Sequence, residues 1–442
     1  MRFVTKLYTE IFTFHYLLQP PCCLIAPVVS TVAEDMNTRI AVLLSGGVDS
    51  SVALSLLRQE PGVTLTAYYL KIWLEDELSY LGDCPWEEDL AYARAVCEKL
   101  DVPLEVVSLQ REYYDRVVQY AINELSIGRT PSPDIFCNQR IKFGVFFERA
   151  GSGFDKIASG HYARIRAADG QYHLLRAPDP VKDQTYFLSH LSQAQLSRAL
   201  FPIGAMKKAE VRQAAVELDL PTKARPDSQG ICFLGKIKYP DFVRHYLGVR
   251  PGAIVEAESG RTLGEHKGYW FHTIGQRQGL GLGNGPWYVV AKDTARNIIY
   301  VSHNEGADTS TRRSFTVGDP SWLCGEPADG RLEVKLRHGP QLIGASISHL
   351  EGGRLRVVLD EPDSGIAPGQ FSVFYAGEEC LGGARIEAAD DANADRGPLR
   401  AVDDSEGDAQ DKARMDEAVF GYSVDTRNIP GSRGELAGNR PQ

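Results

Sequence analysis

The chain has 442 residues, of which 43% are hydrophobic, and its formal net charge is -10. This length leaves room for two or three domains, and no stretch of about 18 apolar residues predicts a membrane-spanning helix. Eight cysteines without paired Cys-x-x-Cys spacings argue against a disulfide scaffold or a zinc ribbon, and we expect no metal ligands. The segment 387–442 has 13 acidic and 7 basic residues, which predicts a disordered acidic tail. The remainder is only mildly acidic, so the charge does not exclude nucleic-acid binding.

Residues 1–36 precede the first predicted core strand. They contain few acidic residues before Glu34, as transit peptides do, although arginine is scarce. We expect this extension to be an organelle transit segment. The alternative is an artefact of the gene model, because Met36 can itself start a complete domain.

Residues 40–57, with the sequence IAVLLSGGVDSSVALSLL, predict a buried strand, a tight loop and a helix. Glycines let the backbone approach a bound group closely, and the first amides of a helix are unpaired, so such a loop can hold phosphate. Ser45, Ser50 and Ser51 add hydroxyl donors. An ordinary turn capped by Asp49 or Ser50 is the alternative, but it explains only part of the cluster. The usual P-loop spacing, Gly-x-x-x-x-Gly-Lys-Ser/Thr, is absent from the sequence.

Strand and helix patterns alternate after this loop. Residues 64–76 predict a second strand, residues 86–109 predict an amphipathic helix and a third strand, and residues 155–163 predict a further strand that ends at Gly160. The order βαβαβ implies a parallel sheet covered by helices, whose ligands bind beyond the carboxyl ends of the strands. The loop 45–50 falls at that edge.

The pattern changes beyond residue 200. Residues 203–222 and 239–249 predict two helices. The first carries Lys207, Lys208 and Arg212, which either contact phosphates of a ligand or form a solvated helix face. Short alternating runs follow, spaced by turn residues, and they predict a small antiparallel β-barrel.

The predicted fold class is therefore α/β, with a parallel-sheet nucleotide domain, a helical connector and a C-terminal antiparallel barrel-like domain. The predicted regions are the extension 1–36, the nucleotide domain 37–198, the connector 199–250, the β domain 251–386 and the tail 387–442. We expect the whole chain to act as a monomer away from membranes.

Cys137 and Cys232 differ from the other cysteines in their surroundings. A proline-rich segment predicts a loop around Cys137, where Arg140 and Lys142 would favour a reactive thiolate. Cys232 lies in a second loop, bounded by proline and glycine. An inert thiol is the alternative for each. Cys97 has apolar neighbours on a predicted helix, which predicts a buried structural thiol.

Six motifs occur in a fixed order along the chain. They are SGGVDS at 45–50, PDIFCN at 133–138, GHY at 160–162, KDQ at 182–184, DSQGICF at 227–233 and WFHTIGQRQGLGLG at 270–283. The first resembles the SGGxDS loop of ATP pyrophosphatases, and the ordered set resembles the tRNA-specific 2-thiouridylase family over roughly residues 38–386. The segment KIWLEDELSYLGDCPWEEDL resembles the cyanobacterial and plastid branch. We therefore expect a plastid location, with the mitochondrion or the cytoplasm as alternatives.

The resemblance implies an ATP-dependent sulfurtransferase that binds ATP and Mg²⁺ at the SGGVDS loop. The O2 atom of the wobble uridine would attack the α phosphate and release pyrophosphate. Cys232 would carry a persulfide from a sulfur donor, and its terminal sulfur would attack C2 directly or after release as hydrosulfide. Cys137 would form a disulfide with Cys232 as AMP leaves, and Asp134 would act as general acid/base. The implied ATP-binding residues are Leu43, Leu44, Ser45, Gly46, Gly47, Val48, Asp49, Ser50, Leu70 and Gly160.

The resemblance also implies contacts with tRNA by the connector 199–250, by Lys182, Asp183 and Gln184, and by Arg337 and His338 in the β domain. The family often has an aromatic residue at the position of His338, so this chain departs from the family pattern there. The wobble base must leave its stack to reach the loop, so we expect it to be flipped into the pocket.

Two other functions fit part of the sequence. A synthase with the same loop could adenylate a small molecule, which would require neither Cys137 nor Cys232. A non-catalytic nucleotide- or RNA-binding protein could retain the loop, but the presence of Asp49, Asp134 and both loop cysteines argues against it. Consumption of ATP in the absence of RNA would separate these functions from RNA thiolation.

Overall fold

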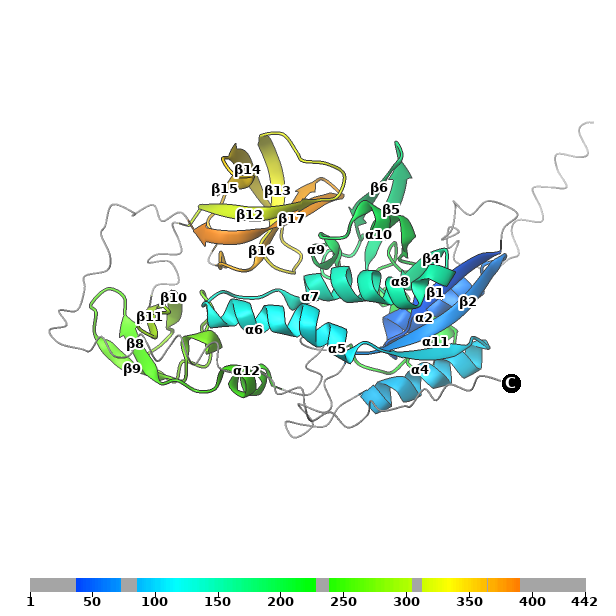
Figure 1. The fold of residues 1–442 in the computed structure, drawn as a ribbon, viewed down its shortest axis with the longest axis horizontal. Coiled ribbons are helices and arrows are strands. Elements are labelled where there is room, and N and C mark those ends of the chain that lie inside the picture. The colour runs from blue at the N-terminus through cyan, green and yellow to red at the C-terminus, as the bar shows by residue number, and fades with distance from the viewer. Residues whose placement is uncertain (1–36, 73–85, 228–237, 304–311, 364, 390–442) are drawn as a thin grey trace, which may run out of the picture. The chain divides into compact units, whose positions relative to one another are not determined.

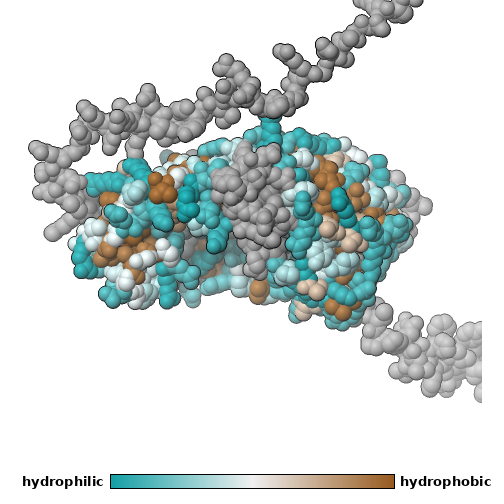
Figure 2. Space-filling model, turned by 90° about the horizontal axis from the view of Figure 1, so that it is seen from below, coloured by the Kyte–Doolittle hydropathy of each residue, from teal (hydrophilic) through white to brown (hydrophobic). Residues whose placement is uncertain are grey.

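The computed structural model describes residues 37–72, 86–227, 238–303, 312–363 and 365–389. The predictions for the extension, for the acidic tail and for Cys232 lie outside these residues. Within them, no helix combines the length and the apolar character needed to cross a membrane. On the face drawn in Figure 2, hydrophobic residues form small separate patches among hydrophilic ones.

A five-stranded parallel sheet forms the first part of the fold (Figure 1). Its spatial order is β3-β2-β1-β4-β7, and the apolar run of the SGGVDS segment supplies its central strand, β1. All four neighbouring pairs are parallel, as the βαβαβ pattern predicted. The strands are β1 (Thr38–Leu43), β2 (Val63–Lys71), β3 (Leu104–Ser108), β4 (Lys156–Ser159) and β7 (Ala199–Leu200).

Three helices position the edge of this sheet where the loop lies. Helix α2 (Val48–Arg58) starts inside the SGGVDS motif, and its apolar residues are buried because it packs between the sheet and other helices. Helix α4 (Trp86–Leu100) contacts β2 and α2. Helix α11 (Lys208–Glu217), from the predicted connector, packs directly on α2. The first residue of α11 therefore lies beside the start of α2.

The segment around Cys137 is helical. Pro133 is the first residue of α7 (Pro133–Phe136), and the chain continues without a break into the π-helix η3 (Cys137–Val145) and α8 (Phe146–Arg149). The prediction of a loop was wrong here, because proline at the first helical position has no amide to lose and a backbone angle already suited to a helix. Other helices in this part are α5 (Gln110–Tyr113), η2 (Tyr114–Val118), α6 (Gln119–Ser126), η4 (Gly151–Gly153), α9 (Thr185–Leu188) and α10 (Gln193–Arg198).

The predicted β domain contains two sheets. Helix α12 (Tyr239–Leu247) precedes a four-stranded sheet of order β10-β11-β8-β9, in which β11 and β8 are parallel. Its strands are β8 (Gly252–Glu256), β9 (Thr262–His266), β10 (Tyr288–Asp293) and β11 (Ile298–Ser302), and η5 (Tyr269–Phe271) lies between β9 and β10.

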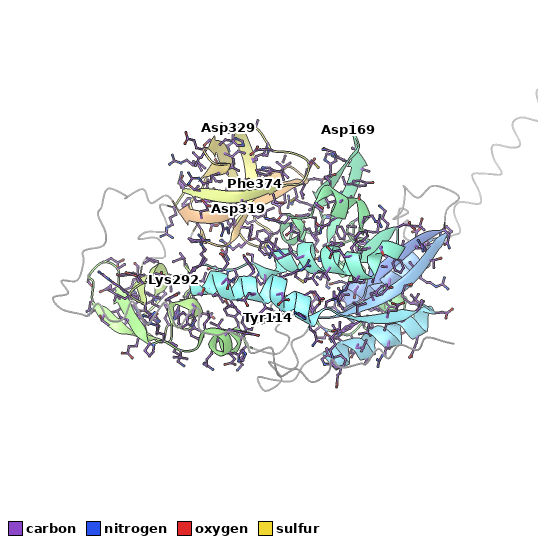
Figure 3. The ribbon with its side chains drawn as sticks, in the orientation of Figure 1. Tyr114, Asp169, Lys292, Asp319, Asp329 and Phe374 are labelled. Carbon is purple, nitrogen blue, oxygen red and sulfur yellow. The ribbon has the colours of Figure 1, made fainter. Side chains whose placement is uncertain are left out.

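A closed six-stranded antiparallel barrel follows. Its strands run in the order β12-β15-β14-β13-β16-β17, and β17 pairs with β12 to close it. Phe374, labelled in Figure 3, is fully buried in its apolar interior. The hairpin of β5 (Ala163–Ala168) and β6 (Gln171–Arg176) extends the barrel sheet, because β6 pairs with β17. The barrel strands are β12 (Ser314–Trp322), β13 (Gly330–Lys335), β14 (Ile343–Leu350), β15 (Arg354–Leu359), β16 (Phe371–Ala376) and β17 (Glu379–Ala389).

Candidate active site

A cavity of about 410 Å³ opens where β1, β2 and β4 end. This is the sheet edge at which parallel α/β folds bind their ligands. Most of the predicted ATP-binding residues line it, and Cys137, Lys182 and Gln184 line the same cavity. The predicted ATP-binding residues in its wall are Leu43, Leu44, Ser45, Gly47, Val48, Asp49, Ser50, Leu70 and Gly160.

Two glycines are needed at this edge because backbones approach each other closely. Gly46 has φ +76°, and a Cβ there would lie 2.2 Å from the backbone oxygen of Asp89. Gly46 is not among the residues that line the cavity, so its role is to let the loop turn against α4. A Cβ at Gly160 would lie 2.7 Å from the amide nitrogen of Ser50. Gly160 therefore lets the end of β4 lie against the start of α2.

The loop serines hold the loop in shape. Ser50 Oγ donates to Gly47 O at 3.1 Å and accepts from the Ser45 amide at 3.2 Å. Ser51 Oγ donates to Gly47 O at 2.8 Å, and Ser51 is fully buried. The expectation that Ser51 offers its hydroxyl to phosphate was therefore wrong, because that hydroxyl is used inside the loop. Ser45 and Ser50 do line the cavity.

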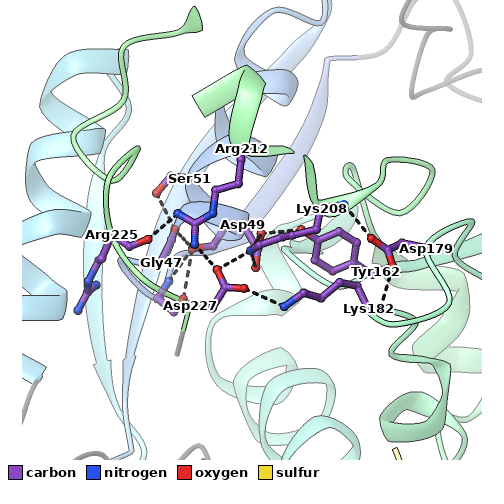
Figure 4. A network of polar contacts seen from close by, with 12 residues as sticks. Gly47, Asp49, Ser51, Tyr162, Asp179, Lys182, Lys208, Arg212, Arg225 and Asp227 are labelled. Carbon is purple, nitrogen blue, oxygen red and sulfur yellow. Dashed lines mark hydrogen bonds and ion pairs between the residues drawn. The ribbon is translucent and has the colours of Figure 1, made fainter. Parts of the chain in front are cut away.

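Asp49 is the carboxylate at the start of α2, and two side chains hold it (Figure 4). Tyr162 donates its hydroxyl to Asp49 Oδ1 at 2.7 Å. Lys208 Nζ, from the first turn of α11, contacts both carboxylate oxygens at 2.7 and 2.9 Å. Burial, together with the charge of Asp49, raises the pKa of Tyr162 far above its usual value, so the hydroxyl stays a donor.

Asp227 brings a second carboxylate to the same cations. It accepts from Lys182 Nζ at 2.8 Å, lies 2.8 Å from Lys208 Nζ and also accepts from Arg212. Burial opposes its charge, but the hydrogen bonds from Lys182 and Lys208 outweigh it and hold the pKa of Asp227 well below its usual value. Lys208 and Arg212 therefore form neither a solvated face nor an outward phosphate-binding surface, since both turn toward carboxylates of the site (Figure 4).

Arg225 fastens the glycine loop from the other side. Its guanidinium donates to Gly46 O at 2.7 Å and to the carboxylate of Asp89 on α4. The same group lies over the ring of Tyr92, 4.6 Å from its centre. A planar cation with several donors can hold a backbone carbonyl and a carboxylate at once, which suits it to a loop-bracing role.

Cys137 is 1% exposed and lines the cavity with Lys142. Arg140, predicted to act on the thiol, lies over the ring of Phe136 at 3.8 Å and donates to Arg116 O at 2.9 Å. Asp134 is half-buried and is not among the residues that line the cavity. No disulfide joins two cysteines of the described residues, and Cys232 lies outside them.

The predicted tRNA-binding residues 182–184 have three different environments. Lys182 and Gln184 line the cavity, and Gln184 accepts the Tyr162 amide at 3.0 Å. Asp183 is fully buried and accepts from Lys335 Nζ of β13 at 2.6 Å. In this conformation the Asp183 side chain cannot contact tRNA, because it is used to join the nucleotide domain to the barrel.

The predicted barrel contacts lie at the surface. Arg337 is 51% exposed and makes two hydrogen bonds to Asp363, at 2.7 and 3.0 Å. The ring of His338 stacks on Phe187 with 4.8 Å between the ring centres. A histidine at this position therefore still supplies a flat ring to the contact with α9.

Sequence reasoning missed three residues of this site and gave two others a different role. Their signals were present in the motifs, since GHY contains Tyr162 and DSQGICF begins with Asp227. The sequence did not predict that side chains of α11 and of the turn after it point toward the glycine loop. Their direction depends on the packing of α11 on α2. The missed residues are Tyr162, Arg225 and Asp227, and the residues given a different role are Lys208 and Arg212.

Three family models match the chain. Residues 38–236 match the tRNA methyl transferase HUP domain, residues 240–303 match the tRNA methyl transferase PRC-barrel domain, and residues 312–386 match the aminomethyltransferase beta-barrel domain. The matched ranges coincide closely with the sheet domain and its connector, the sheet of β8 to β11, and the six-stranded barrel.

The alignments with curated relatives cover nearly the whole length of those relatives. The tRNA-specific 2-thiouridylase MnmA 1 of Bacteroides thetaiotaomicron is 48% identical over 354 residues, which is 78% of this chain and 99% of the relative. The tRNA-specific 2-thiouridylase MnmA of Porphyromonas gingivalis is 44% identical over 358 residues, which is 78% of this chain and 98% of that relative. Among solved structures, the U34-tRNA thiolase NcsA of Methanococcus maripaludis aligns at 19% identity with a TM-score of 0.30, over 50% of this chain and 76% of that one, too weakly to support an argument. By its relatives and its site, the chain belongs to the MnmA tRNA-specific 2-thiouridylase family.

Proposed function

We propose that this chain catalyses the ATP-dependent 2-thiolation of the wobble uridine of a tRNA. The observation that carries the proposal is that Cys137 lines the same cavity as the SGGVDS loop. A thiol beside a phosphate-binding loop lets activation of a uridine oxygen and delivery of sulfur take place at one base. Membership of the 2-thiouridylase family supports the same substrate.

ATP would bind with its phosphates on the loop at the start of α2. Lys142 and Lys182 line this cavity, and Lys208 contacts Asp49 of the loop. In this structure the Asp227 carboxylate holds Lys182 and Lys208. A triphosphate carries more charge than one carboxylate and would replace it on these cations. Leu70 and Gly160, at the ends of β2 and β4, would flank the adenosine.

A magnesium ion fits this site mainly through the phosphates of ATP. Mg²⁺ is usually held by one or two carboxylates, substrate phosphates and water, and Asp49 is the carboxylate at the loop. When bound, the ion would supply charge neutralisation on the phosphates. The other roles in the reaction are assigned to residues of the chain.

The chemistry we propose has two stages. The uridine O2 attacks the α phosphate, the bond to pyrophosphate breaks, and C2 then carries an adenylate leaving group. The terminal sulfur of a Cys232 persulfide bonds to C2, the Cys137 thiolate attacks the inner sulfur, and a Cys137–Cys232 disulfide forms as AMP leaves. An external dithiol must return two electrons to this disulfide before the next turnover. Asp134, one helical turn before Cys137, would exchange the proton at the base.

Several further predictions concern residues outside the described part of the chain. Transfer of sulfur from a donor protein depends on Cys232, and the plastid location depends on the extension 1–36.

Arg337 and the ring of His338 are the exposed barrel residues through which we propose that tRNA is positioned. The monomeric state also stays a prediction.

The test is thiolation of a tRNA transcript with a wobble uridine by the full-length chain, with ATP, Mg²⁺, a persulfide donor and a dithiol. Mass measurement of the digested nucleosides would detect 2-thiouridine. We expect Cys137→Ser to abolish product, because serine cannot form the disulfide. Cys97→Ser is the matched control, since Cys97 lies buried in α4 outside the cavity wall, and it should retain activity.

Two outcomes would contradict the proposal. Pyrophosphate release without any change in tRNA mass would leave the loop assignment intact and indicate a small-molecule acceptor. Equal product from Cys137→Ser and Cys97→Ser would show that the cavity thiol takes no part in sulfur transfer.

A further inference from the structure

Three side chains with metal-binding atoms meet at the junction of the β5–β6 hairpin with the barrel. His173 comes from β6, Cys324 follows the end of β12, and Glu379 is the first residue of β17. Their ligand atoms all lie within 4.8 Å of one another, and each residue is half-buried. Within the described residues, no other group of three His, Cys, Asp or Glu side chains has this geometry.

The distances fit a tetrahedral ion. Cys324 Sγ lies 3.7 Å from His173 Nδ1. Zinc bonds of about 2.3 Å to sulfur and about 2.0 Å to nitrogen, at a tetrahedral angle, separate those two atoms by roughly 3.6 Å. His173 Nδ1 and Glu379 Oε1 are hydrogen-bonded at 2.6 Å, so the carboxylate must move back by less than ~1 Å to make room for an ion.

The ligand types select the ion. A thiolate and an imidazole favour zinc over magnesium or calcium, which prefer oxygen alone. A carboxylate is an accepted third ligand, and three protein ligands leave the fourth position to water. On binding, the thiol proton of Cys324 would pass to solvent, because the thiolate is the form that binds metal.

Neighbouring side chains already orient two of the ligands. Gln193 Nε2 donates to Cys324 Sγ at 3.4 Å and to Leu323 O at 2.7 Å, which holds the segment after β12. Arg166 lies 3.6 Å from Glu379 Oε2, the oxygen that does not contact His173. Supporting contacts of this kind are typical of metal sites, where they fix the direction of each ligand.

We propose that His173, Cys324 and Glu379 bind a zinc ion that joins the hairpin of the nucleotide domain to the barrel. The three residues are not among those that line the ATP cavity, so the ion would take no part at the nucleotide site and would hold the hairpin against the barrel. His173 and Glu379 are 206 positions apart in sequence. An ion bound to the folded chain stabilises it by mass action, in addition to the pairing of β6 with β17.

The experiment uses the full-length chain carrying Cys137→Ser and Cys232→Ser, which removes the two thiols assigned to sulfur transfer. After treatment with a chelator, Zn²⁺ is titrated against a chromophoric competitor, and Co²⁺ is titrated in parallel to detect a thiolate-to-cobalt absorption band. We expect about one equivalent to bind, the cobalt band to appear, and Zn²⁺ to raise the melting temperature. Adding Cys324→Ala should remove the band and the melting shift.

Two further variants separate a metal site from a hydrogen-bonded pair. Glu379→Gln keeps a hydrogen-bonding partner for His173 but weakens the ligand, so we expect at least tenfold weaker Zn²⁺ binding with a similar melting temperature in chelator. Cys97→Ala, which removes a buried thiol elsewhere, should bind Zn²⁺ normally. Binding that is equal in Cys324→Ala, Glu379→Gln and Cys97→Ala, or no binding in the parent, would overturn the proposal.

Discussion

Lys182 and Asp183 are neighbours in sequence, but their charges lie in opposite environments. Lys182 points into the nucleotide cavity and pairs with Asp227, and the two side chains are 35% and 24% exposed. Asp183 points the other way and pairs with Lys335, and neither of these side chains has any exposed surface. One peptide bond therefore separates an ion pair that solvent and ligand can reach from one that they cannot.

The difference shows how burial decides what an ion pair does. The Asp183 carboxylate also accepts from Thr185 Oγ1 at 2.9 Å and lies 3.6 Å from Arg176 Nε, so its oxygens are fully used. A buried charge that loses its partner has no water to replace it, which makes this pair a fixed structural contact. The Lys182–Asp227 pair can exchange partners, because water can solvate either charge and phosphate can replace the carboxylate.

The largest expected effect comes from breaking the buried pair. Asp183→Ala would leave the Lys335 ammonium buried without a counter-charge, which costs about 3–5 kcal/mol of unfolding free energy. Urea unfolding of the purified chain would measure it. Replacing both residues, as in Asp183→Leu with Lys335→Met, should recover most of the loss. A single variant as stable as the parent would show that solvent reaches the pair.

Two buried histidines extend the comparison to groups that would have no opposite charge beside them if they were protonated. Burial, with Arg140 nearby, lowers the pKa of His190 to about 4. Burial, with His266 and Lys292 nearby, lowers the pKa of His272 to about 4. The unfolded chain therefore binds more protons between pH 6.5 and pH 4, so stability falls as the pH falls through this window.

Each of these histidines is expected to remove up to ~3 kcal/mol of stability by pH 4. Thermal unfolding measured from pH 7 down to pH 4 would test this loss. His190→Gln should flatten the dependence, because glutamine has no proton to take up. His303→Gln, at an exposed position, should leave the slope unchanged. A parent whose melting temperature is constant from pH 7 to pH 4 would contradict the expectation.

Lys208 tests the ion pairs of the cavity, where it contacts Asp49 and Asp227. Lys208→Ala removes a cation that bridges Asp49 and Asp227, and we expect kcat/KM for thiolation to fall about 100-fold, as for other donors lost from a site of developing charge. Stability should change little. Lys207→Ala is the matched control, because Lys207 precedes α11 and is exposed. Equal losses in both variants would point to a general effect of charge on tRNA binding.

Asp227 gives the smallest expected effect. Asp227→Asn removes the charge that competes with phosphate for Lys182 and Lys208, so ATP should bind about tenfold more tightly. Calorimetry with a non-hydrolysable ATP analogue would measure it directly. Asp219→Asn, at an exposed carboxylate held by Lys99 and Lys223, is the control and should leave affinity unchanged. Weaker binding in Asp227→Asn would mean that this carboxylate supports the nucleotide site.

The outcome of the predictions differs by residue. The strand, the loop and the helix around SGGVDS were predictable, because apolar periodicity and glycine act locally. The helical environment of Cys137 was not predicted, since a proline that starts a helix is hard to distinguish from one that ends it. The burial of Asp183 was also hidden, because its partner Lys335 is 152 positions away.

The sequence by itself determined the α/β class, the strand–loop–helix unit around SGGVDS, the barrel and the family resemblance, because these depend on local patterns and ordered motifs. Tertiary structure alone decided that Cys137 shares a cavity with the loop and that Lys208 faces Asp49. It also placed His173, Cys324 and Glu379 together. These side chains meet only when the sheet, the connector and the barrel pack, and packing depends on long-range contacts that no local pattern specifies.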